Sequence, residues 1–356
     1  MSLAARLSRC PTPYDPARGA EAVARLAGQP AEVQALIGGA AGCSPYLADL
    51  IRQEADWLEG ALDHPEGAAE AVISGVADLT HDALSAELRR AKRRIALVTA
   101  LADLGGVWPL ETVTQVLTDF ADRAVQAAIA HLIAAEVARG KLPTADGDAG
   151  MVVLAMGKLG AGELNYSSDI DLICLFDETR YAPDDYHEVR AAFIRVTRAM
   201  AAMLSENRNG GYVFRTDLRL RPDASVTPVC MSMEAAERYY ESVGRTWERA
   251  AYIKARVCAG DVHAGQRFLD TLRPFVWRKH LDFAAIQDAH DMRLKIRDHK
   301  GLHGDLVLEC HNMKLGRGGI REIEFFTQTR QLIAGGRDLS LRDPTTKGGL
   351  AALAQA

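Results

Sequence analysis

Two aspartates separated by one residue, Asp169 and Asp171, are the strongest candidates for chemistry in this sequence. They follow a glycine-rich turn and lead into an apolar run, Leu172–Phe176. Side chains two residues apart on a strand point the same way, so both carboxylates would lie on one face. Carboxylates held this close repel each other unless a cation lies between them. Because Mg²⁺ prefers oxygen ligands and keeps substrate phosphates as partners, the pair indicates a magnesium site.

An acidic pair of this kind can also be a solvated turn at the end of a strand. Two observations favour the metal interpretation. A strand-like apolar run, Met151–Met156, precedes the turn and another follows it, which is typical of a central strand. A third carboxylate, Asp217, stands downstream in the alternating segment Gly211–Pro222.

The segment around Asp217 alternates between apolar and charged side chains. On a strand, Arg215, Asp217, Arg219 and Arg221 would share one face. Burying three arginines without an anionic partner would be costly. A site with a metal ion and phosphate groups would satisfy both signs, because Asp217 would complete the metal ligands and an arginine would pair with phosphate oxygens. An edge strand with a solvated charged face is the alternative.

The glycine-rich turn does not match two other phosphate-binding patterns. A Walker A loop needs glycine five residues before the Gly157–Lys158 pair and a hydroxyl after it, but Val152 and Leu159 stand there. The spacing of the glycines does not fit the dinucleotide fingerprint either. The pattern fits two-metal nucleotidyl transfer, in which metals roughly 3.5–4 Å apart align the attacking and leaving oxygens. Ser168 and the backbone of the turn would hold phosphate oxygens.

The elements that must position these residues are mostly helices. The composition, 48% hydrophobic and 25% charged, is that of an ordinary globular protein. A chain of 356 residues suffices for two or three domains with a sizeable core. Apolar periodicity predicts helices over Asp82–Asp103, Val113–Ala138, Tyr186–Glu206, Met233–Val243 and Trp247–Val257.

Two groups of basic residues allow more than one interpretation. The helix face at Arg89–Arg94 could suit nucleic acid, but solvation or docking onto an acidic helix is more common. The net charge of −5 argues against general nucleic-acid affinity. Trp247, Arg249, Lys254 and Arg256 form the second group, and their spacing would put Arg249 and Arg256 on one helix face. These residues either hold nucleotide phosphates or brace the core.

A second glycine-rich turn lies in the last third of the chain and precedes a predicted helix. Free backbone N–H groups at a helix start bind anions, and Lys314, Arg317 and Arg321 add positive charge. Glu322 and Glu324 are two residues apart, so they cannot share one helix face. We expect Glu322 to pair with an arginine and Glu324 to orient a basic residue or a metal-bound water. A capped helix with solvated charges is the alternative.

The remaining composition favours a cytoplasmic protein. The six cysteines show no C-x-x-C spacing, which fits reduced thiols better than a disulfide framework. No signal peptide is visible, and no apolar run approaches the ~20 residues that span a membrane. We therefore expect neither a membrane nor a nucleic-acid partner.

Four motifs, in this order, resemble those of the bifunctional glutamine synthetase adenylyltransferase/adenylyl-removase family. They are Gly157–Leu172, Asp217–Asp223, Trp247–Arg256 and Lys314–Phe325. The resemblance covers nearly the whole chain, from about residue 30 onward. It implies an α+β, mostly helical fold with a DNA polymerase β-like nucleotidyltransferase core and a small mixed sheet.

The resemblance also divides the chain into three parts. We expect an N-terminal helical segment over residues 1–116, the nucleotidyltransferase core over 117–260, and a C-terminal helical segment over 261–356 that is the start of a helical domain. The chain is far shorter than the full-length family, which implies a fragment or a truncated product.

The family has two similar halves, of which one removes AMP from a tyrosine of glutamine synthetase and the other attaches it. This chain resembles the removing half, because Asn165 and Ser167 stand where the attaching half usually has glycine and because Arg321–Glu324 is similar. The resemblance implies phosphorolysis: phosphate attacks the AMP phosphorus, the tyrosine leaves, and ADP forms. Transfer of AMP from ATP to a protein tyrosine, a non-catalytic regulatory fragment and a nucleic-acid polymerising transferase are the alternatives.

The resemblance implies that Asp169, Asp171 and Asp217 are catalytic and bind two Mg²⁺ ions. Phosphate or nucleotide would contact residues of both glycine-rich turns and the arginines after Asp217, namely Gly157, Lys158, Ser167, Ser168, Arg219, Arg221, Lys314, Arg321 and Glu324. The expected substrates are phosphate and ADP, or ATP. The implied partners are adenylylated glutamine synthetase, a PII-type nitrogen signal protein and the C-terminal adenylyltransferase half of the full-length protein.

Overall fold

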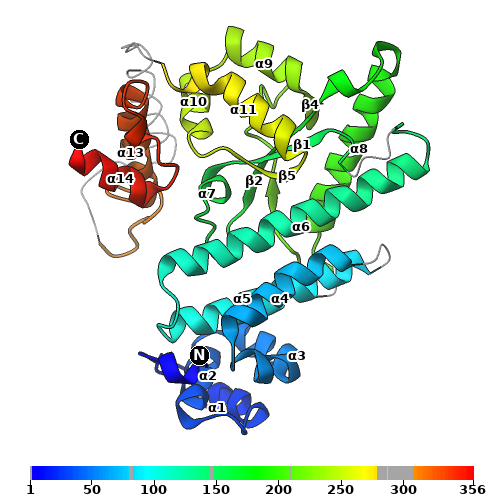
Figure 1. The fold of residues 1–356 in the computed structure, drawn as a ribbon. Coiled ribbons are helices and arrows are strands. Elements are labelled where there is room, and N and C mark those ends of the chain that lie inside the picture. Colours follow the sequence, from blue (N-terminus) through cyan, green and yellow to red (C-terminus); the bar gives the residue numbers. More distant parts are fainter. Residues whose placement is uncertain (1, 80–82, 144–147, 209, 279–286, 288–307) are drawn as a thin grey trace. The chain divides into compact units, whose positions relative to one another are not determined.

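Helices dominate the protein, which also contains one small mixed sheet (Figure 1), as the α+β, mostly helical expectation required. The structure, a computed structural model, describes residues 2–79, 83–143, 148–208, 210–278, 287 and 308–356. The chain forms two compact units, each assembled from separated stretches. Unit 1 consists of Met1–Gly147, Gly162–Ile170 and Arg195–Thr216, and unit 2 of Asp148–Ala161, Asp171–Ile194 and Asp217–Ala356.

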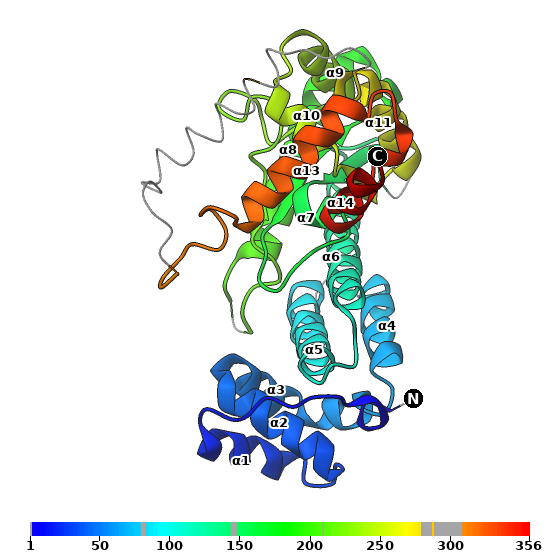
Figure 2. The same ribbon diagram turned by 90° about the vertical axis from the view of Figure 1, so that its left-hand side faces the viewer.

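Most of unit 1 is α-helical. Its helices, in chain order, are α1 (Pro16–Arg25), α2 (Ala31–Cys43), α3 (Pro45–Ala61), α4 (Pro65–Gly75), α5 (Leu84–Leu104) and α6 (Leu110–Ala138). Figure 2 shows α1, α2 and α3 packed side by side. Glycine permits the close approach of α1 to α2, since a Cβ atom on Gly19 would lie 2.6 Å from the carbonyl oxygen of Gly38. The helices predicted over 82–103 and 113–138 are confirmed as α5 and α6, and the expected boundary after residue 116 falls inside α6.

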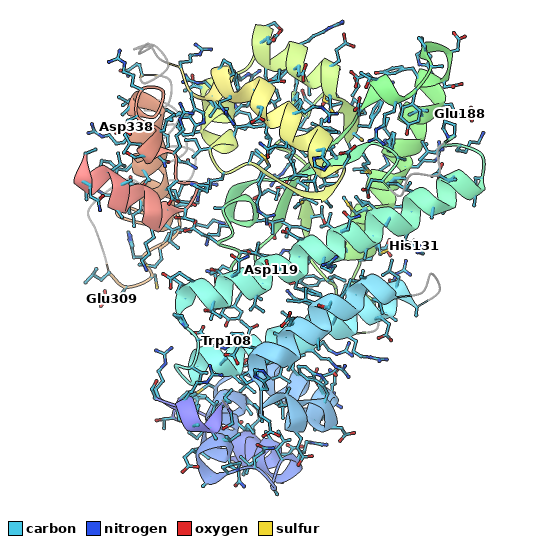
Figure 3. All side chains as sticks on the ribbon, in the orientation of Figure 1. Trp108, Asp119, His131, Glu188, Glu309 and Asp338 are labelled. Carbon is cyan, nitrogen blue, oxygen red and sulfur yellow. The ribbon has the colours of Figure 1, made fainter. Side chains whose placement is uncertain are left out.

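A carboxylate of α4 joins the N-terminal segment to the turn between α5 and α6. Glu66 accepts hydrogen bonds from Arg6 at 2.7 Å and from the indole of Trp108, labelled in Figure 3, at 2.6 Å. Burial alone would raise the pKa of the Glu66 carboxyl, but these hydrogen bonds hold it at about 2. The contact fixes three separate stretches of unit 1.

The basic face at Arg89–Arg94 is used inside unit 1. Arg93 and Arg94 both bind Glu54 of α3, at 2.9 and 2.8 Å, and the Glu54 side chain is only 5% exposed. Arg94 also lies 5.1 Å from the ring centroid of Trp57. Docking onto an acidic neighbouring helix was one of the interpretations of this face, and the structure confirms it.

Arg89 has a different role from its basic neighbours. It is 2% exposed and donates to the backbone carbonyls of Met203 (3.2 Å), Glu206 (2.9 Å) and Gly211 (2.7 Å). Two of these carbonyls lie at the end of α8 (Tyr186–Ser205), where the last carbonyls of a helix lack intrahelical partners. Arg89 therefore caps α8.

The sheet belongs mainly to unit 2. Its strands are β1 (Met151–Ala155), β2 (Ile170–Phe176), β3 (Thr216–Asp217), β4 (Cys230–Ser232) and β5 (Arg256–Gly260). They lie in the order β3-β2-β1-β5, and β4 also pairs with β2. Because β1 is antiparallel to β2 and β5 whereas β4 is parallel to β2, the sheet is mixed, as expected.

Helices cover both faces of β2 within unit 2. Besides the first part of α8, the helices of this unit among the described residues are α7 (Gly157–Gly160), α9 (Met233–Ser242), α10 (Thr246–Tyr252), α11 (Val262–Val276), α13 (Ile320–Ala334) and α14 (Thr346–Gln355). Ile173 of β2 shares a buried cluster with Tyr240 of α9 and Phe268 of α11. On the opposite face, Phe176 stacks on Phe193 of α8 with ring centroids 5.0 Å apart. Burial on both faces explains the continuous apolar runs in the sequence.

The helix predicted over Trp247–Val257 is correct only in its first part. The helix ends at Tyr252, and the chain continues as strand β5 from Arg256. Pairing with β1 supplies the backbone hydrogen bonds of this stretch, so tertiary context overrides local periodicity. Arg249 and Arg256 therefore do not share a helix face.

Within the described residues, no helix combines the length and the apolar character needed to cross a membrane.

Candidate active site

The first glycine-rich turn is fixed by close backbone contacts within unit 2. A Cβ atom on Gly160 would lie 2.0 Å from the carbonyl oxygen of Lys254, so only glycine fits at this position of α7. Arg256 of β5 donates to the carbonyl oxygen of Leu159 at 3.0 Å. The turn is therefore anchored to the chain that enters β5 and cannot move independently of the sheet.

Asp171 lies directly beside this turn. It is the one residue of β2 that is not buried, and its backbone carbonyl accepts from the N–H of Met156 at 2.9 Å. Gly157 has a φ of 55°, in the left-handed region that favours glycine. A Cβ atom there would lie 2.9 Å from Oδ2 of Asp171, so a larger residue would crowd the carboxylate.

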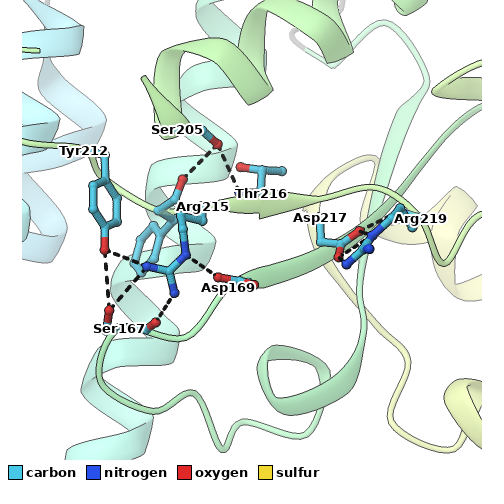
Figure 4. Close-up of polar contacts among 9 residues, drawn as sticks. Ser167, Asp169, Ser205, Tyr212, Arg215, Thr216, Asp217 and Arg219 are labelled. Carbon is cyan, nitrogen blue, oxygen red and sulfur yellow. Dashed lines mark hydrogen bonds and ion pairs between the residues drawn. The ribbon is translucent and has the colours of Figure 1, made fainter. Parts of the chain in front are cut away.

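Asp169 immediately precedes β2 and belongs to a polar cluster in unit 1 (Figure 4). Its Oδ1 atom accepts from Nε of Arg215 at 2.5 Å. The guanidinium of Arg215 also donates to the carbonyl oxygen of Ser167 and, at 2.9 Å, to the hydroxyl of Tyr212. The Asp169 and Arg215 side chains are 51% and 49% exposed, so solvent reaches the pair.

Asp217 ends strand β3 and is also paired with an arginine. Its side chain is 15% exposed and accepts from the backbone N–H of Arg219 at 2.8 Å and from Nε at 2.9 Å. The hydrogen bond from Arg219 holds the pKa of the Asp217 carboxyl below its usual range, although burial opposes this. Asp217 is therefore a carboxylate near neutral pH, and the 84% exposed side chain of Arg219 reaches back to it from solvent (Figure 4).

The strand expected over 211–222 is confirmed only at β3, Thr216–Asp217, and is wrong on either side of these two residues. The chain turns instead around Arg221, whose guanidinium donates to the carbonyls of Leu218 (2.7 Å), Ala224 (2.8 Å) and Thr227 (3.1 Å). Arg221 thus braces a loop, and the alternation of the segment does not continue as a strand face. Of the two arginines after Asp217, Arg219 is the one that contacts a candidate metal ligand, namely Asp217.

The second glycine-rich turn opens helix α13, as predicted. Glu322 accepts from the backbone N–H of Gly318 at 2.9 Å, and the side chains of Lys314 and Arg321 are exposed. Glu324 binds Nζ of the buried Lys254 at 2.9 Å. Glu324 therefore orients a basic residue, one of the two roles expected for it.

The basic group around Trp247 is used to brace unit 2. Arg249 is 5% exposed and donates to the carbonyl oxygen of Val276 at 3.3 Å. Lys254 is 3% exposed and binds Thr346 of α14 at 3.1 Å as well as its acidic partner. With Arg256 on the glycine-rich turn, these contacts support the bracing interpretation over phosphate binding.

The three carboxylates are ligands of the type that Mg²⁺ prefers, but two of them are hydrogen-bonded to arginines. Asp169, Asp171 and Asp217 offer the hard oxygen ligands that this ion prefers. In the part of the chain that the structure describes, no group of three or more His, Cys, Asp or Glu side chains is arranged to hold a metal ion. The residues are therefore of the type that binds this ion. For the ion to bind, Arg215 and Arg219 would have to release their hydrogen bonds to the carboxylate oxygens of Asp169 and Asp217.

The sequence does not indicate Tyr212 as a residue of the site, and it does not predict the partners of Arg215 and Arg256. Arg215 was part of the predicted charged face, but its choice of Asp169 depends on a contact between distant stretches. The alternation of Tyr212 with apolar residues suggested a core position, whereas its hydroxyl bonds Arg215. No signal in the sequence indicates that Arg256 holds Leu159.

A small mixed sheet that begins a strand with paired aspartates, beside a glycine-rich turn, has the architecture of a nucleotidyltransferase-type fold. The family model described as glutamate-ammonia ligase adenylyltransferase matches residues 35–271, and the model described as GlnD PII-uridylyltransferase matches residues 290–355. The chain belongs to the glutamate-ammonia ligase adenylyltransferase family.

Several curated relatives share the printed name bifunctional glutamine synthetase adenylyltransferase/adenylyl-removing enzyme. That of Bradyrhizobium sp. (strain BTAi1) is 51% identical over 90% of this chain and 34% of its own length. Those of Rhodopseudomonas palustris (strain CGA009) and Rhizobium meliloti (strain 1021) are 47% and 46% identical, over 99% and 96% of this chain and 38% and 36% of their own lengths. The chain thus spans about a third of the length of these relatives.

Proposed function

We propose that this chain removes AMP from an adenylylated tyrosine of glutamine synthetase by phosphorolysis. The observation that carries the proposal is the pair Asp169 and Asp171, positioned at the start of β2 with Asp171 against Gly157. The names of the relatives support glutamine synthetase as the target. Asn165 and Ser167, by resemblance, favour removal over attachment.

In the proposed reaction an oxygen of inorganic phosphate attacks the AMP phosphorus. The bond between that phosphorus and the tyrosine oxygen breaks, the phenolate takes up a proton, and ADP forms. Asp169, Asp171 and Asp217 would hold Mg²⁺. When bound, this ion would stabilise the negative charge that develops on the reacting oxygens.

Other residues would bind and orient the phosphate groups. Lys158, Ser168 and the backbone of the glycine-rich turn would hold phosphate oxygens. Arg219 is exposed and lies at Asp217, so its guanidinium would pair with phosphate in two-point geometry. Lys314 and Arg321 would add positive charge from the second turn.

The second candidate is the forward reaction, transfer of AMP from ATP to the tyrosine. The printed name of the relatives contains both activities, and one site can catalyse a reaction in both directions. We further propose that the chain works in the cytoplasm, with a PII-type signal protein and the adenylyltransferase half of a longer protein as partners.

One assay tests the proposed function. The chain is incubated with AMP-modified glutamine synthetase and Mg²⁺, with and without phosphate, and ADP is measured. We expect ADP only when phosphate is present. Transfer of labelled AMP from ATP to unmodified synthetase, without phosphorolysis, would assign this chain the forward reaction instead.

Asparagine variants of the paired aspartates test which residues carry the activity. Asp169→Asn and Asp171→Asn keep the side-chain shape but lose the charge of a metal ligand, so ADP formation should fall at least about 100-fold. Far-UV circular dichroism should be unchanged. Asp49→Asn, on the exposed surface of α3, is the matched control and should keep full activity. Near-normal turnover in either site variant would refute the metal assignment.

A further inference from the structure

Arg215 forms an ion pair with Asp169, one of the proposed metal ligands. Its Nε atom bonds Oδ1 of Asp169 at 2.5 Å, and among the described residues it is the one side chain that bonds this carboxylate. Both side chains are about half exposed. An ion pair in such a position is weak enough to be exchanged, because water competes for both partners.

Arg215 has anchors that do not involve Asp169. Its guanidinium donates to the carbonyl oxygen of Ser167 and to the hydroxyl of Tyr212, and its Cζ atom lies 5.6 Å from the centroid of the Tyr212 ring. Ser167 has a left-handed φ of 52°, which is uncommon for a residue other than glycine. The guanidinium can therefore keep its place when the Oδ1 atom of Asp169 is taken by another partner.

We propose that Arg215 competes with the divalent cation for Oδ1 of Asp169 and thereby sets the cation concentration at which the site fills. The inference rests on the proposed function, because it takes Asp169 as a metal ligand. When the cation binds Asp169, Arg215 keeps its contacts with Ser167 and Tyr212. Its charge, no longer neutralised by the carboxylate, becomes available to an anion such as phosphate.

A second cation makes this exchange more costly. The Nζ atom of Lys92 in α5 lies 4.1 Å from the centroid of the Phe214 ring. Phe214 directly precedes Arg215 in the sequence. Burial, and then the charge of Arg215, lower the pKa of Lys92 to about 8. Asp169 therefore offsets repulsion between two like charges, and a cation that takes Asp169 must overcome the renewed repulsion. Removing the charge of Arg215 removes both the competing ion pair with Asp169 and the repulsion between Arg215 and Lys92.

The test measures cation binding and does not depend on catalysis. Mn²⁺, whose free form is quantified by electron paramagnetic resonance, is titrated into the whole chain at constant ionic strength. We expect Arg215→Gln to bind Mn²⁺ about two- to fivefold more tightly than the unchanged protein, the range that an exposed ion pair supports. Arg215→Lys keeps the charge but loses the planar donor geometry, so its affinity should lie between the two.

The control separates competition for Asp169 from a general change in charge. Arg208→Gln removes an exposed cation of the same unit that pairs with Glu206, and it should bind Mn²⁺ like the unchanged protein. Equal or weaker Mn²⁺ affinity in folded Arg215→Gln would overturn the proposal. If Arg215→Gln does not fold, the Mn²⁺ affinity of Arg215→Lys becomes the test. An affinity equal to that of the unchanged protein would then overturn the proposal.

A crystal structure of the unchanged protein with Mn²⁺ gives an independent answer. We expect the metal at Asp169 and the distance from Arg215 Nε to Asp169 Oδ1 beyond hydrogen-bonding range. A bound metal with the ion pair intact would overturn the competition. If Mn²⁺ binds equally to Asp169→Asn, or does not bind at all, the metal site itself is wrong and both proposals fail. Affinity that depends on Asp169 but not on Arg215 overturns only the further inference.

Discussion

Lys92 is a cation in an environment that disfavours charge. Its pKa of about 8 lies below the roughly 10.4 of a lysine in an unfolded chain. Between these two values the unfolded chain binds the proton more tightly than the folded protein does. The free energy of unfolding should therefore rise with pH from about 8 to about 10, and the full penalty applies below pH 8.

Replacing Lys92 with Met tests this. The variant should raise the free energy of unfolding at pH 7 by about 1–2 kcal/mol, because a charge in a half-buried position is replaced by an apolar side chain of similar length. Its stability should also be flat between pH 8 and 10, as measured by urea denaturation at several pH values. Arg198→Met, which removes an exposed cation of α8, should change neither quantity. A slope equal to that of the unchanged protein would show that Lys92 is not the titrating group.

The sequence was informative about residue types at the candidate site and less so about their pairing. The spacing of Asp169 and Asp171 and the apolar runs around them predicted a strand that carries carboxylates at its start, and β2 confirms this strand. The arginines after Gly211 were also recognised as a charged set. Which aspartate each arginine binds was not predictable, because β3 ends at Asp217 and the chain is then free to turn Arg219 back onto its neighbour.

At the scale of elements, the cap that Arg89 provides for α8 gives a second prediction. Arg89→Met removes a charged donor from three backbone carbonyls at partly buried hydrogen bonds, so unfolding should require about 2–4 kcal/mol less free energy. Arg90→Met is the matched control. Arg90 is 49% exposed and pairs with Glu87 on the same helix, so its loss should cost no more than about 0.5 kcal/mol. Equal effects in the two variants, measured by urea denaturation, would contradict the capping role.

The close packing of α7 gives a third prediction. Gly160→Ala should lower the free energy of unfolding by about 2–3 kcal/mol or more, because the new methyl group would overlap the carbonyl of Lys254. ADP formation should fall as well, since the turn beside Asp171 must shift. Gly60→Ala is the control: no atom lies within 4 Å of its added Cβ, and alanine in a helix should stabilise by about 0.5–1 kcal/mol. Thermal unfolding of both variants checks that the first substitution lowers the stability and the second raises it.

Element prediction succeeded where order is local and failed where it depends on distant partners. Long amphipathic helices such as α5, α6 and α8 were predicted to within a few residues, because their period repeats over several turns. Strand β5 was assigned to a helix, because only its pairing with β1 makes it a strand. The brevity of β3 likewise follows from the contacts of Arg221, which no local pattern encodes.

At the scale of the whole molecule, a truncation tests the expected boundary between residues 116 and 117. Residues 117–356 would lack α1 to α5 and the first two turns of α6, so the rest of α6 would lose the helix α5 against which it packs. We expect this fragment to aggregate on size exclusion and to unfold without cooperativity, whereas the full chain unfolds cooperatively. A monomeric fragment with a sharp unfolding transition would support a domain boundary at that position.

The pairing of β1 with β5 has a consequence for biosynthesis. Residues 151–155 leave the ribosome long before residues 256–260, to which they bind. At a synthesis rate of about 5–20 residues per second, the intervening chain takes roughly 5–20 s to appear. During that interval the entirely apolar β1 has no partner on one side, and a nascent chain in this state is a natural client for chaperones that recognise apolar strands.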